Sequence, residues 1–529
     1  MQKKIITRRD FIRSTSMVLA GGLIGWTPLA GAQMRNGPGG GGGGMGGGGG
    51  GMGGGGTTAI DPPVGALLQD PVEMSYVRKE PGLVELNLSA EISTVNVNGT
   101  SANLMTFNGR FPGPTIRARK GDRVKINYTN LLPNTGNNLL GYQRNLTNLH
   151  THGWHVSPEP PADYVMYKLD TNDTYYHEYN LMHQEGGTFN FYHPHKHGVS
   201  AEQYWAGLVG ALIVEDDAEL SLLGSYETHI LILKDISLSG SEPAPHDAMM
   251  DFMQGKEGNV VMVNGQVNPQ LNIKPGQVQR WRVLNASNAR FYRLSLENHP
   301  IYVIGTDGGL LDKPYSRSEI VLSPGERIDL LVQGAPSGSG SHRLLSLPYS
   351  RMGMNTSPTI TLMTMTYSGK LTKKQQKEVP GLPSSINPSA VRLNAAAPPI
   401  AAYHDLALSM GQGNGYINGM DFDVDPYAIM SSAGTYEIWT IFNDSGMDHP
   451  FHQHVNPAQI LSISGGDAGY NSLYTTAPAW KDTVLVPKWG SVTMLVPVMD
   501  YTGMAMFHCH ILEHEDIGMM GVWHIMGGM

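Results

Sequence analysis

The chain has 529 residues, too many for one ordinary domain, and 40% of them are hydrophobic, enough to bury several cores. With 36 basic and 45 acidic residues the net charge is −9, which argues against a nucleic-acid-binding surface. One cysteine excludes a disulfide framework, an iron–sulfur cluster held by several thiolates and a cysteine-only zinc site, whereas 20 histidines indicate a metal protein.

Residues 1–32 have the layout of an export signal. The pair Arg8 and Arg9 precedes an uncharged run from Ser14 to Ala32, which ends in small residues typical of a cleavage site. The surroundings of this pair resemble the twin-arginine signal, a route known for carrying folded proteins. No later apolar run reaches the roughly 18 residues of a membrane span. We therefore expect an exported, periplasmic protein with no membrane span in its mature form.

Residues 33–69 are expected to form a flexible tether. Within them, the segment 37–56 holds 17 glycines, interrupted only by Pro38, Met45 and Met52. Such a composition cannot form a packed core. The two methionines could touch copper, but a plain spacer is the favoured interpretation.

Past the tether, short β-branched runs alternate with glycine, proline and asparagine turns, as in β-sandwiches. One pattern occurs three times: an Asn-Gly turn, beginning at Asn108, Asn264 and Asn418, leads to a second turn, an alternating strand and another asparagine. Equivalent positions lie roughly 155 residues apart, the size of one domain. The pattern predicts three related β-sandwich domains and a connector. The domains are expected at residues 70–217, 225–368 and 400–529, with the connector at 369–399.

Ten of the 20 histidines fall into four tight groups, two in the first predicted domain and two in the last. They are His150, His152, His193, His195, His449, His452, His454, His508, His510 and His514. Residues two apart in a strand share a face. If these runs are strands, eight imidazoles meet in one space between the first and last domains. Cys509 and His449 then face the opposite side, which predicts two copper environments.

Cys509 belongs to a second kind of ligand set. Together with His449 and His514 it supplies one thiolate and two imidazoles, and Met519 follows it by ten residues. This is the ligand list of a blue copper site, whose weak axial thioether helps to set the reduction potential. The eight remaining histidines of the groups are enough to hold three copper ions with room for oxygen.

These motifs, with the segments Phe111–Pro114 and Phe191–His195 and the ending His510–Met519, resemble bacterial three-domain multicopper oxidases. That group contains laccases, bilirubin oxidases and the periplasmic cuprous oxidases of copper tolerance. The resemblance covers roughly residues 75–529. It implies an all-β chain of three cupredoxin-like Greek-key β-sandwich domains with four copper ions.

The resemblance also implies which side chains hold each copper. Type 1 copper is expected at Cys509, His449, His514 and Met519, and type 2 copper at His150 and His452. One type 3 ion is expected at His152, His193 and His508, and the other at His195, His454 and His510.

The implied reaction takes four electrons singly from a donor at type 1 copper and passes them through Cys509 to the cluster, where O2 becomes two waters. Glu515 and Asp163 match acidic residues with proton-handling roles in the family. A surface charge is the alternative for Glu515, and a loop or capping role is the alternative for Asp163. Thr151 stands where many relatives have tryptophan, a departure that leaves the ligands in place.

The donor is left open among phenols, aromatic amines and Cu(I). Met447 and Asp448 directly precede His449, so they are candidates for substrate contact, since thioethers beside carboxylates can bind Cu(I). Further methionines group at 249–253 and 352–354, although methionine also fills irregular cores. A role in copper tolerance and a monomeric state are also expected.

Two other functions are alternatives to the oxidase. A copper nitrite reductase fits poorly, because those proteins use two such domains per chain and lack the complete eight-histidine set. A non-enzymatic periplasmic protein that binds or sequesters copper is the alternative from another class. The presence of every ligand position favours the oxidase, and copper content measured together with oxygen uptake distinguishes the two.

Overall fold

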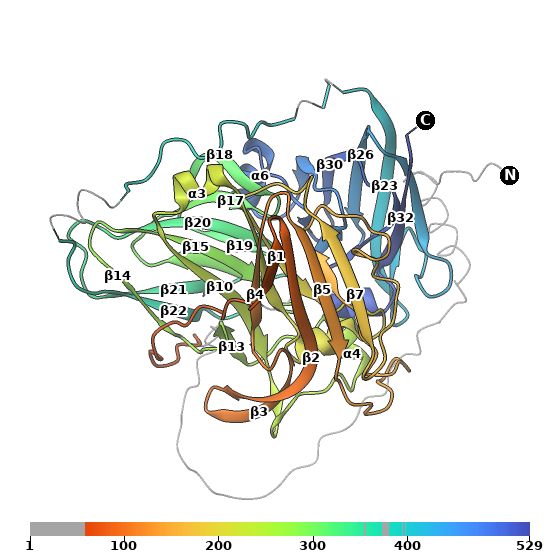
Figure 1. Ribbon diagram of the computed structural model, residues 1–529, viewed down its shortest axis with the longest axis horizontal. Coiled ribbons are helices and arrows are strands. Elements are labelled where there is room, and N and C mark those ends of the chain that lie inside the picture. The colour runs from red at the N-terminus through yellow and green to blue at the C-terminus, as the bar shows by residue number, and fades with distance from the viewer. Residues whose placement is uncertain (1–58, 354–355, 373–379, 394, 397, 529) are drawn as a thin grey trace, which may run out of the picture. The chain divides into compact units, whose positions relative to one another are not determined.

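The computed structural model describes residues 59–353, 356–372, 380–393, 395–396 and 398–528. The predicted signal at 1–32 and the first part of the predicted tether lie outside the described residues. The described chain is built mainly of paired β-sheets, as Figure 1 shows in orange, green and blue for successive parts of the chain. Among the described helices, none is both long and apolar enough to cross a membrane.

The first sandwich packs one sheet, in the order β1-β2-β5-β7 with β3 against β2, on a second sheet, β4-β9-β8-β6. Its elements are β1 (Val77–Glu80), β2 (Leu83–Val97), β3 (Thr100–Phe107), β4 (Gly113–Arg119), β5 (Arg123–Asn130), β6 (His150–His152), β7 (Thr174–Asn180), β8 (Thr188–His193), α2 (Ser200–Trp205) and β9 (Gly210–Glu215). Leu86 and Leu88 of β2 are buried while Asn87 between them is exposed, the alternation of a strand with one buried face.

The second sandwich joins the sheet β13-β10-β15-β20-β17-β18 to the sheet β14-β22-β21-β16-β19. Its elements are α3 (Asp217–Leu223), β10 (Glu227–Ile236), β11 (Leu238–Ser239), β12 (Glu242–Pro243), α4 (Met249–Gln254), β13 (Val260–Val263), β14 (Gln270–Ile273), β15 (Val278–Asn285), β16 (Tyr292–Leu296), β17 (Ile301–Thr306), β18 (Gly309–Arg317), β19 (Ile320–Leu322), β20 (Arg327–Gln333), β21 (Ser341–Leu347) and β22 (Ile360–Tyr367). The central strand β15 is buried along its whole length, so this sheet is covered on both faces.

The third sandwich packs the sheet β24-β23-β26-β30-β28 on the sheet β25-β32-β31-β27-β29. Its elements are β23 (Ile400–Gly411), β24 (Asn414–Ile417), β25 (Tyr427–Ser432), β26 (Thr435–Asn443), β27 (His449–Gln453), β28 (Gln459–Ser464), α6 (Ala468–Thr476), β29 (Thr483–Val486), β30 (Ser491–Val498), β31 (Gly503–Cys509), α7 (Leu512–Asp516) and β32 (Met520–Met526). Trp439 and Trp523 meet edge to face in its core. The prediction of three cupredoxin-like Greek-key β-sandwiches is confirmed, while the exact domain limits stay a prediction.

The described end of the predicted tether is bound to the second sandwich. Ile60 pairs with Ile360 and Leu67 with Gln270, so the segment adds to the β14–β22 edge before the chain enters the first sandwich. The backbone N–H of Leu68 donates to the Gln270 carbonyl at 2.8 Å. The expectation of a flexible tether up to residue 69 is therefore wrong for this stretch, because the unpaired edge of a sheet offers backbone partners to any extended segment.

Candidate metal centre

The four histidine groups meet where the first and third sandwiches face each other. Strands β6 and β8 pair His150 with His193, and strands β27 and β31 pair His452 with His508. Strand pairing thus places each group beside its partner group. His454 and His510 come directly after the ends of their strands and His195 comes two residues after the end of β8, so regular alternation does not extend to them.

Rings from the two sandwiches interleave. His150 stacks on His454 with centroids 4.0 Å apart, and His152 stacks on His452 at 3.7 Å. The eight rings that were expected to converge do lie together, and each residue is at most 2% exposed. They are His150, His152, His193, His195, His452, His454, His508 and His510.

The arrangement of the last histidine pair differs from the expected one. Nε2 of His508 lies 3.1 Å from Nε2 of His195 and 3.4 Å from Nε2 of His454, so these three converge on one point. The ring of His510 instead lies 4.9 Å from His152 and 5.6 Å from His193, centroid to centroid. The pairing implied by the resemblance is therefore wrong: His508 and His510 exchange places, because the strand ends at Cys509 and the chain then turns.

The ring nitrogens are prepared for metal ligation. Nδ1 of His150, His193 and His452 is held at 2.8 to 2.9 Å by Asp163 Oδ2, the Pro194 carbonyl and the Asp482 carbonyl respectively. Donation through Nδ1 fixes the tautomer and leaves the lone pair on Nε2. In the described structure, Nε2 of these three rings is buried and has no hydrogen-bond partner, so a metal ion fits there.

Burial keeps these imidazoles uncharged. Desolvation, followed by repulsion from neighbouring rings, lowers the pKa of most of the cluster well below its ordinary value, which disfavours the imidazolium form. The rings affected in this way are His152, His193, His195, His454, His508 and His510. Neutral imidazole is the form that binds copper.

A second ligand set lies on the other face of β31, as the alternation predicted. Cys509 Sγ is 3.5 Å from Nδ1 of both His449 and His514, and those two nitrogens are 3.2 Å apart. Burial raises the pKa of the Cys509 thiol and lowers the pKa of His449 to about 3. Met519 is buried beside the set, and its carbonyl accepts a hydrogen bond from the Cys509 N–H. One thiolate with two imidazoles fits a blue copper ion.

The two predicted acidic residues are both buried at the cluster. Asp163 accepts hydrogen bonds from His150 Nδ1 and from the Thr151 N–H, each at 2.8 Å, which makes it an anchor for the His150 ring. Glu515 is fully buried, with its oxygens 3.5 Å from His195 Nδ1 and 3.3 Å from His508 Nδ1. The alternative that Glu515 is a surface charge is therefore wrong.

Sequence reasoning did not identify two further residues at the cluster. Asp482 Oδ1 lies 3.6 Å from His452 Nδ1 and 3.8 Å from His152 Nδ1. Arg327, from the second sandwich, binds both oxygens of Asp482 at 2.7 and 2.5 Å. Neither residue lies in a motif with ligand spacing, so no pattern in the sequence indicates them.

The candidate substrate residues beside His449 differ in access. Asp448 is only 2% exposed and accepts hydrogen bonds from Tyr349 and the Lys488 N–H, so its carboxylate fastens the loop. Met447 is half-buried, with its sulfur 3.1 Å from Arg351 Nη1. Trp489, which is 72% exposed, lies over Gly446 beside Met447.

Other methionines lie near the Cys509 set. Helix α4 lies against α7, and its Met249 and Met250 are 39% and 59% exposed. Met352 is half-buried next to Arg351, whereas Met354 lies outside the described residues. The 249–253 group is therefore both accessible and close to His514.

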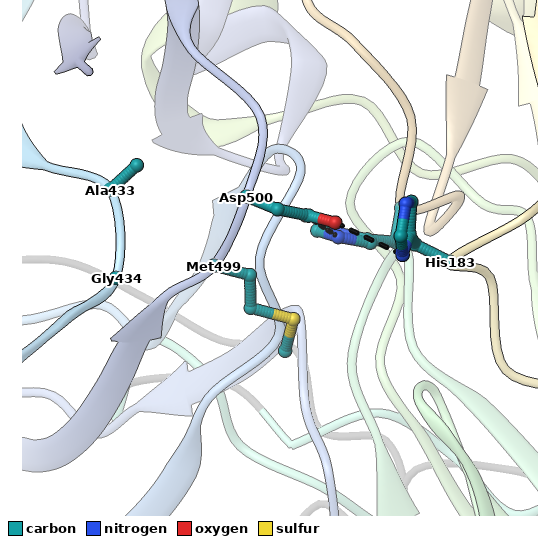
Figure 2. Close-up of a pocket in the computed structure, with 6 residues that line it drawn as sticks. His183, Ala433, Gly434, Met499 and Asp500 are labelled. Carbon is teal, nitrogen blue, oxygen red and sulfur yellow. Dashed lines mark hydrogen bonds and ion pairs between the residues drawn. The ribbon is translucent and has the colours of Figure 1, made fainter. Parts of the chain in front are cut away.

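Two histidines outside the predicted ligand sets are hydrogen-bonded to carboxylates instead. Nε2 of His155 lies 2.7 Å from Asp500, and His197 lies 2.9 Å from Asp423. Asp500 also lies 3.2 Å from His183 Nδ1, and both residues line, with Met499, a pocket of about 530 Å³ between the first and third sandwiches (Figure 2).

The sequence and the structure were compared with those of known proteins. Models of the multicopper oxidase family match residues 89–219, 226–344 and 395–527. The chain is 29% identical to a laccase of Bacillus subtilis over 465 residues, covering 79% of the chain and 89% of the laccase. It is also 29% identical to the multicopper oxidase mco of Staphylococcus aureus, covering 80% and 84%. A solved multicopper oxidase from Campylobacter jejuni, described as a metallo-oxidase, superposes with a TM-score of 0.73 at 25% identity, covering 89% and 97%.

Proposed function

Because the chain belongs to the multicopper oxidase family and is a copper-binding oxidase, we propose that it removes four electrons singly from a donor and reduces O2 to two waters. The observation that carries this proposal is Cys509, whose two sequence neighbours, His508 and His510, both belong to the eight-histidine cluster. A one-electron site is thereby joined to an oxygen site by a single stretch of main chain.

Four copper ions per chain are proposed, in sets that follow the geometry. Type 1 copper would be held by Cys509, His449, His514 and Met519, and type 2 copper by His150 and His452. The type 3 ions would be held by His152, His193 and His510, and by His195, His454 and His508. Bound copper supplies one-electron redox chemistry and oxygen activation.

The protein contributes orientation and exclusion of water. The anchors at Nδ1 hold the rings with Nε2 facing inward, and complete burial keeps solvent away from the cluster. Asp163 is proposed as the anchor of His150, and Glu515 as the group that hands protons toward the oxygen site. Glu515 suits this role because its carboxylate lies between His195 and His508.

Glu515→Gln is expected to slow oxygen reduction roughly 100-fold, the lower end of what a positioned proton-transfer group contributes. The amide keeps the volume of the carboxyl but cannot release a proton. The blue absorption should stay unchanged, because Glu515 does not contact Cys509 Sγ. The measurement is steady-state oxygen uptake across pH, with Glu185→Gln, an exposed carboxylate, as control. Unchanged turnover and an unchanged pH profile would refute the role.

The oxidase proposal is tested on the whole copper-loaded protein. Four coppers per chain, a blue absorption band and oxygen uptake with a donor are the expected results. Bound copper without oxygen uptake would support a copper-sequestering protein instead. Export through the twin-arginine-type signal to the periplasm, and a role in copper tolerance, are proposed together with this activity.

The donor is proposed to be oxidised above the Cys509 set. Exposed Trp489 offers a flat apolar surface that suits phenols and aromatic amines. Exposed Met249 and Met250, with Met447 nearby, offer soft thioethers that suit Cu(I). The two donor classes would therefore use different side chains at one surface.

Met447→Leu is expected to lower kcat/KM for Cu(I) roughly tenfold, or about 1.4 kcal/mol of transition-state stabilisation, because a thioether ligand is lost. Phenol oxidation should not change. The measurement compares steady-state rates on Cu(I) and on a phenol, with and without excess Cu(II). Met504→Leu, which removes another partly exposed methionine at the start of β31, is the control. Equal Cu(I) rates in both variants and wild type would exclude Met447 as a contact.

A further inference from the structure

The second sandwich supplies none of the eight clustered histidines, yet one of its loops touches the cluster. This loop, Ser323–Arg327, joins β19 to β20 and is fully buried. It carries Gly325 and Arg327, which contact different parts of the cluster.

Arg327 ties the three sandwiches together at one guanidinium group. Its Nη1 and Nη2 bind the two oxygens of Asp482 in the third sandwich at 2.7 and 2.5 Å. Its Nε donates to the Phe189 carbonyl and its Nη2 to Asn190 Oδ1 in the first sandwich, both at 3.1 Å. A planar fork with fixed donors suits such a bidentate contact, which an ammonium group cannot reproduce.

Asp482, which Arg327 holds in place, lies beside two rings of the cluster, those of His452 and His152. Its carboxylate oxygen faces Nδ1 of both His452 and His152, at 3.6 and 3.8 Å, and these rings stack on each other. Its backbone carbonyl accepts the hydrogen bond from His452 Nδ1 at 2.9 Å. The orientation of Asp482 therefore bears on the orientation of both rings.

The main chain at Gly325 packs closely against a third ring of the cluster, that of His510. A Cβ atom at this position would lie 2.8 Å from Cδ2 and Cγ of His510, closer than real contacts allow, and the backbone φ is +80°. Only glycine lets the main chain approach the ring this closely in this conformation. The Gly325 carbonyl also accepts a hydrogen bond from Arg327 Nη1 at 3.0 Å.

The loop is held in place by further buried charges. Lys481 Nζ lies 2.7 Å from both Asp307 and Glu326, and the Arg327 N–H donates to Asp307 at 2.8 Å. All these side chains are fully buried. An ion-paired network without access to water resists displacement, because breaking any pair leaves an uncompensated buried charge.

We propose that Arg327 and Gly325 are positioning residues through which the second sandwich sets the geometry of the copper cluster. This inference rests on the proposed function and extends it to the sandwich that contributes no histidine to the cluster. Arg327 acts on His452 through Asp482 and on His152 both through Asp482 and directly, since its Nη1 lies 3.4 Å from His152 Nδ1. Gly325 acts on His510 directly.

The first test is Arg327→Lys, which keeps the charge and removes the fork. We expect the blue absorption to stay unchanged. A chelator should remove the cluster coppers at a concentration 10- to 100-fold lower than the wild-type protein requires, because losing a residue that orients metal ligands usually weakens metal binding by this factor. The hyperfine splitting of type 2 copper in electron paramagnetic resonance should also change. Arg280→Lys is the matched control: Arg280 is equally buried and pairs with Asp329 and Glu219 in the same sandwich, away from the cluster.

Gly325→Ala is the second test, because it removes no ion-paired side chain and places a methyl group against His510, at a backbone φ that strains alanine. It should lower cluster copper affinity without altering the blue absorption. If the wild-type protein takes up no cluster copper, the proposed function fails. If it does, and both variants hold copper and give type 2 spectra like those of wild type and Arg280→Lys, the positioning role is refuted. Should Arg327→Lys not fold, Gly325→Ala alone decides.

Discussion

Replacing Cys509 by serine is expected to make the copper-loaded protein colourless and to reduce donor oxidation below detection. The thiolate is the soft ligand of the set, and its sulfur lies 3.5 Å from Nδ1 of both His449 and His514. A serine hydroxyl does not bind copper as a soft anion at neutral pH. The measurements are the visible spectrum and oxygen uptake with a phenol and with Cu(I).

The exchange at Cys509 changes chemistry with little change in packing. Serine is close in size to cysteine, and its hydroxyl can form a hydrogen bond with the nearby ring nitrogens. The free energy of unfolding of the metal-free protein should therefore change by only about 1 kcal/mol. Met506→Leu, a buried substitution on the same strand, is the control and should stay blue and active. Full activity of the serine variant would overturn the proposed mechanism.

Replacing His454 by leucine is expected to separate the two halves of the reaction. His454 Nε2 lies 3.4 Å from His508 Nε2 within the eight-histidine cluster. It does not belong to the ligand set of Cys509. Leucine fills similar volume but offers no lone pair. The blue colour should therefore remain and should bleach when donor is added without oxygen, yet oxygen should no longer restore it.

The readout for His454→Leu is the blue absorption followed through one cycle of anaerobic reduction and re-exposure to air. His197→Gln is the control, since His197 follows the cluster residues in sequence but pairs with Asp423. The control should recolour at the wild-type rate. Recolouring of the leucine variant at that same rate would show that His454 is not needed for oxygen reduction.

The shared face of the histidines in each group could be predicted because strand alternation is a short-range rule. It placed Cys509 on one side of β31 and His508 on the other, as the structure has them. Alternation put His508 and His510 on one face but did not distinguish between them. The assignment of these two rings to their partner rings came from the family resemblance, and the structure exchanges them.

Other parts of the site follow from long-range contacts that no local pattern encodes. Arg327 and Asp482 are 155 residues apart and meet only because two sandwiches pack together. Asp448 is a candidate for substrate contact because it precedes His449 in the sequence. Its two carboxylate oxygens, however, accept hydrogen bonds from the Tyr349 hydroxyl and the Lys488 backbone N–H. Proximity in sequence therefore placed the residue correctly and left its exposure undetermined.

The segment that docks on the β14–β22 edge has a consequence for biosynthesis. Asp61 accepts a hydrogen bond from Thr361, a residue 300 positions later, so this latch closes only after about two thirds of the polypeptide has been translated. Leu68 can already meet Gln270 when β14 has been made, so the stretch is fastened in two steps, with its Asp61 end the later one.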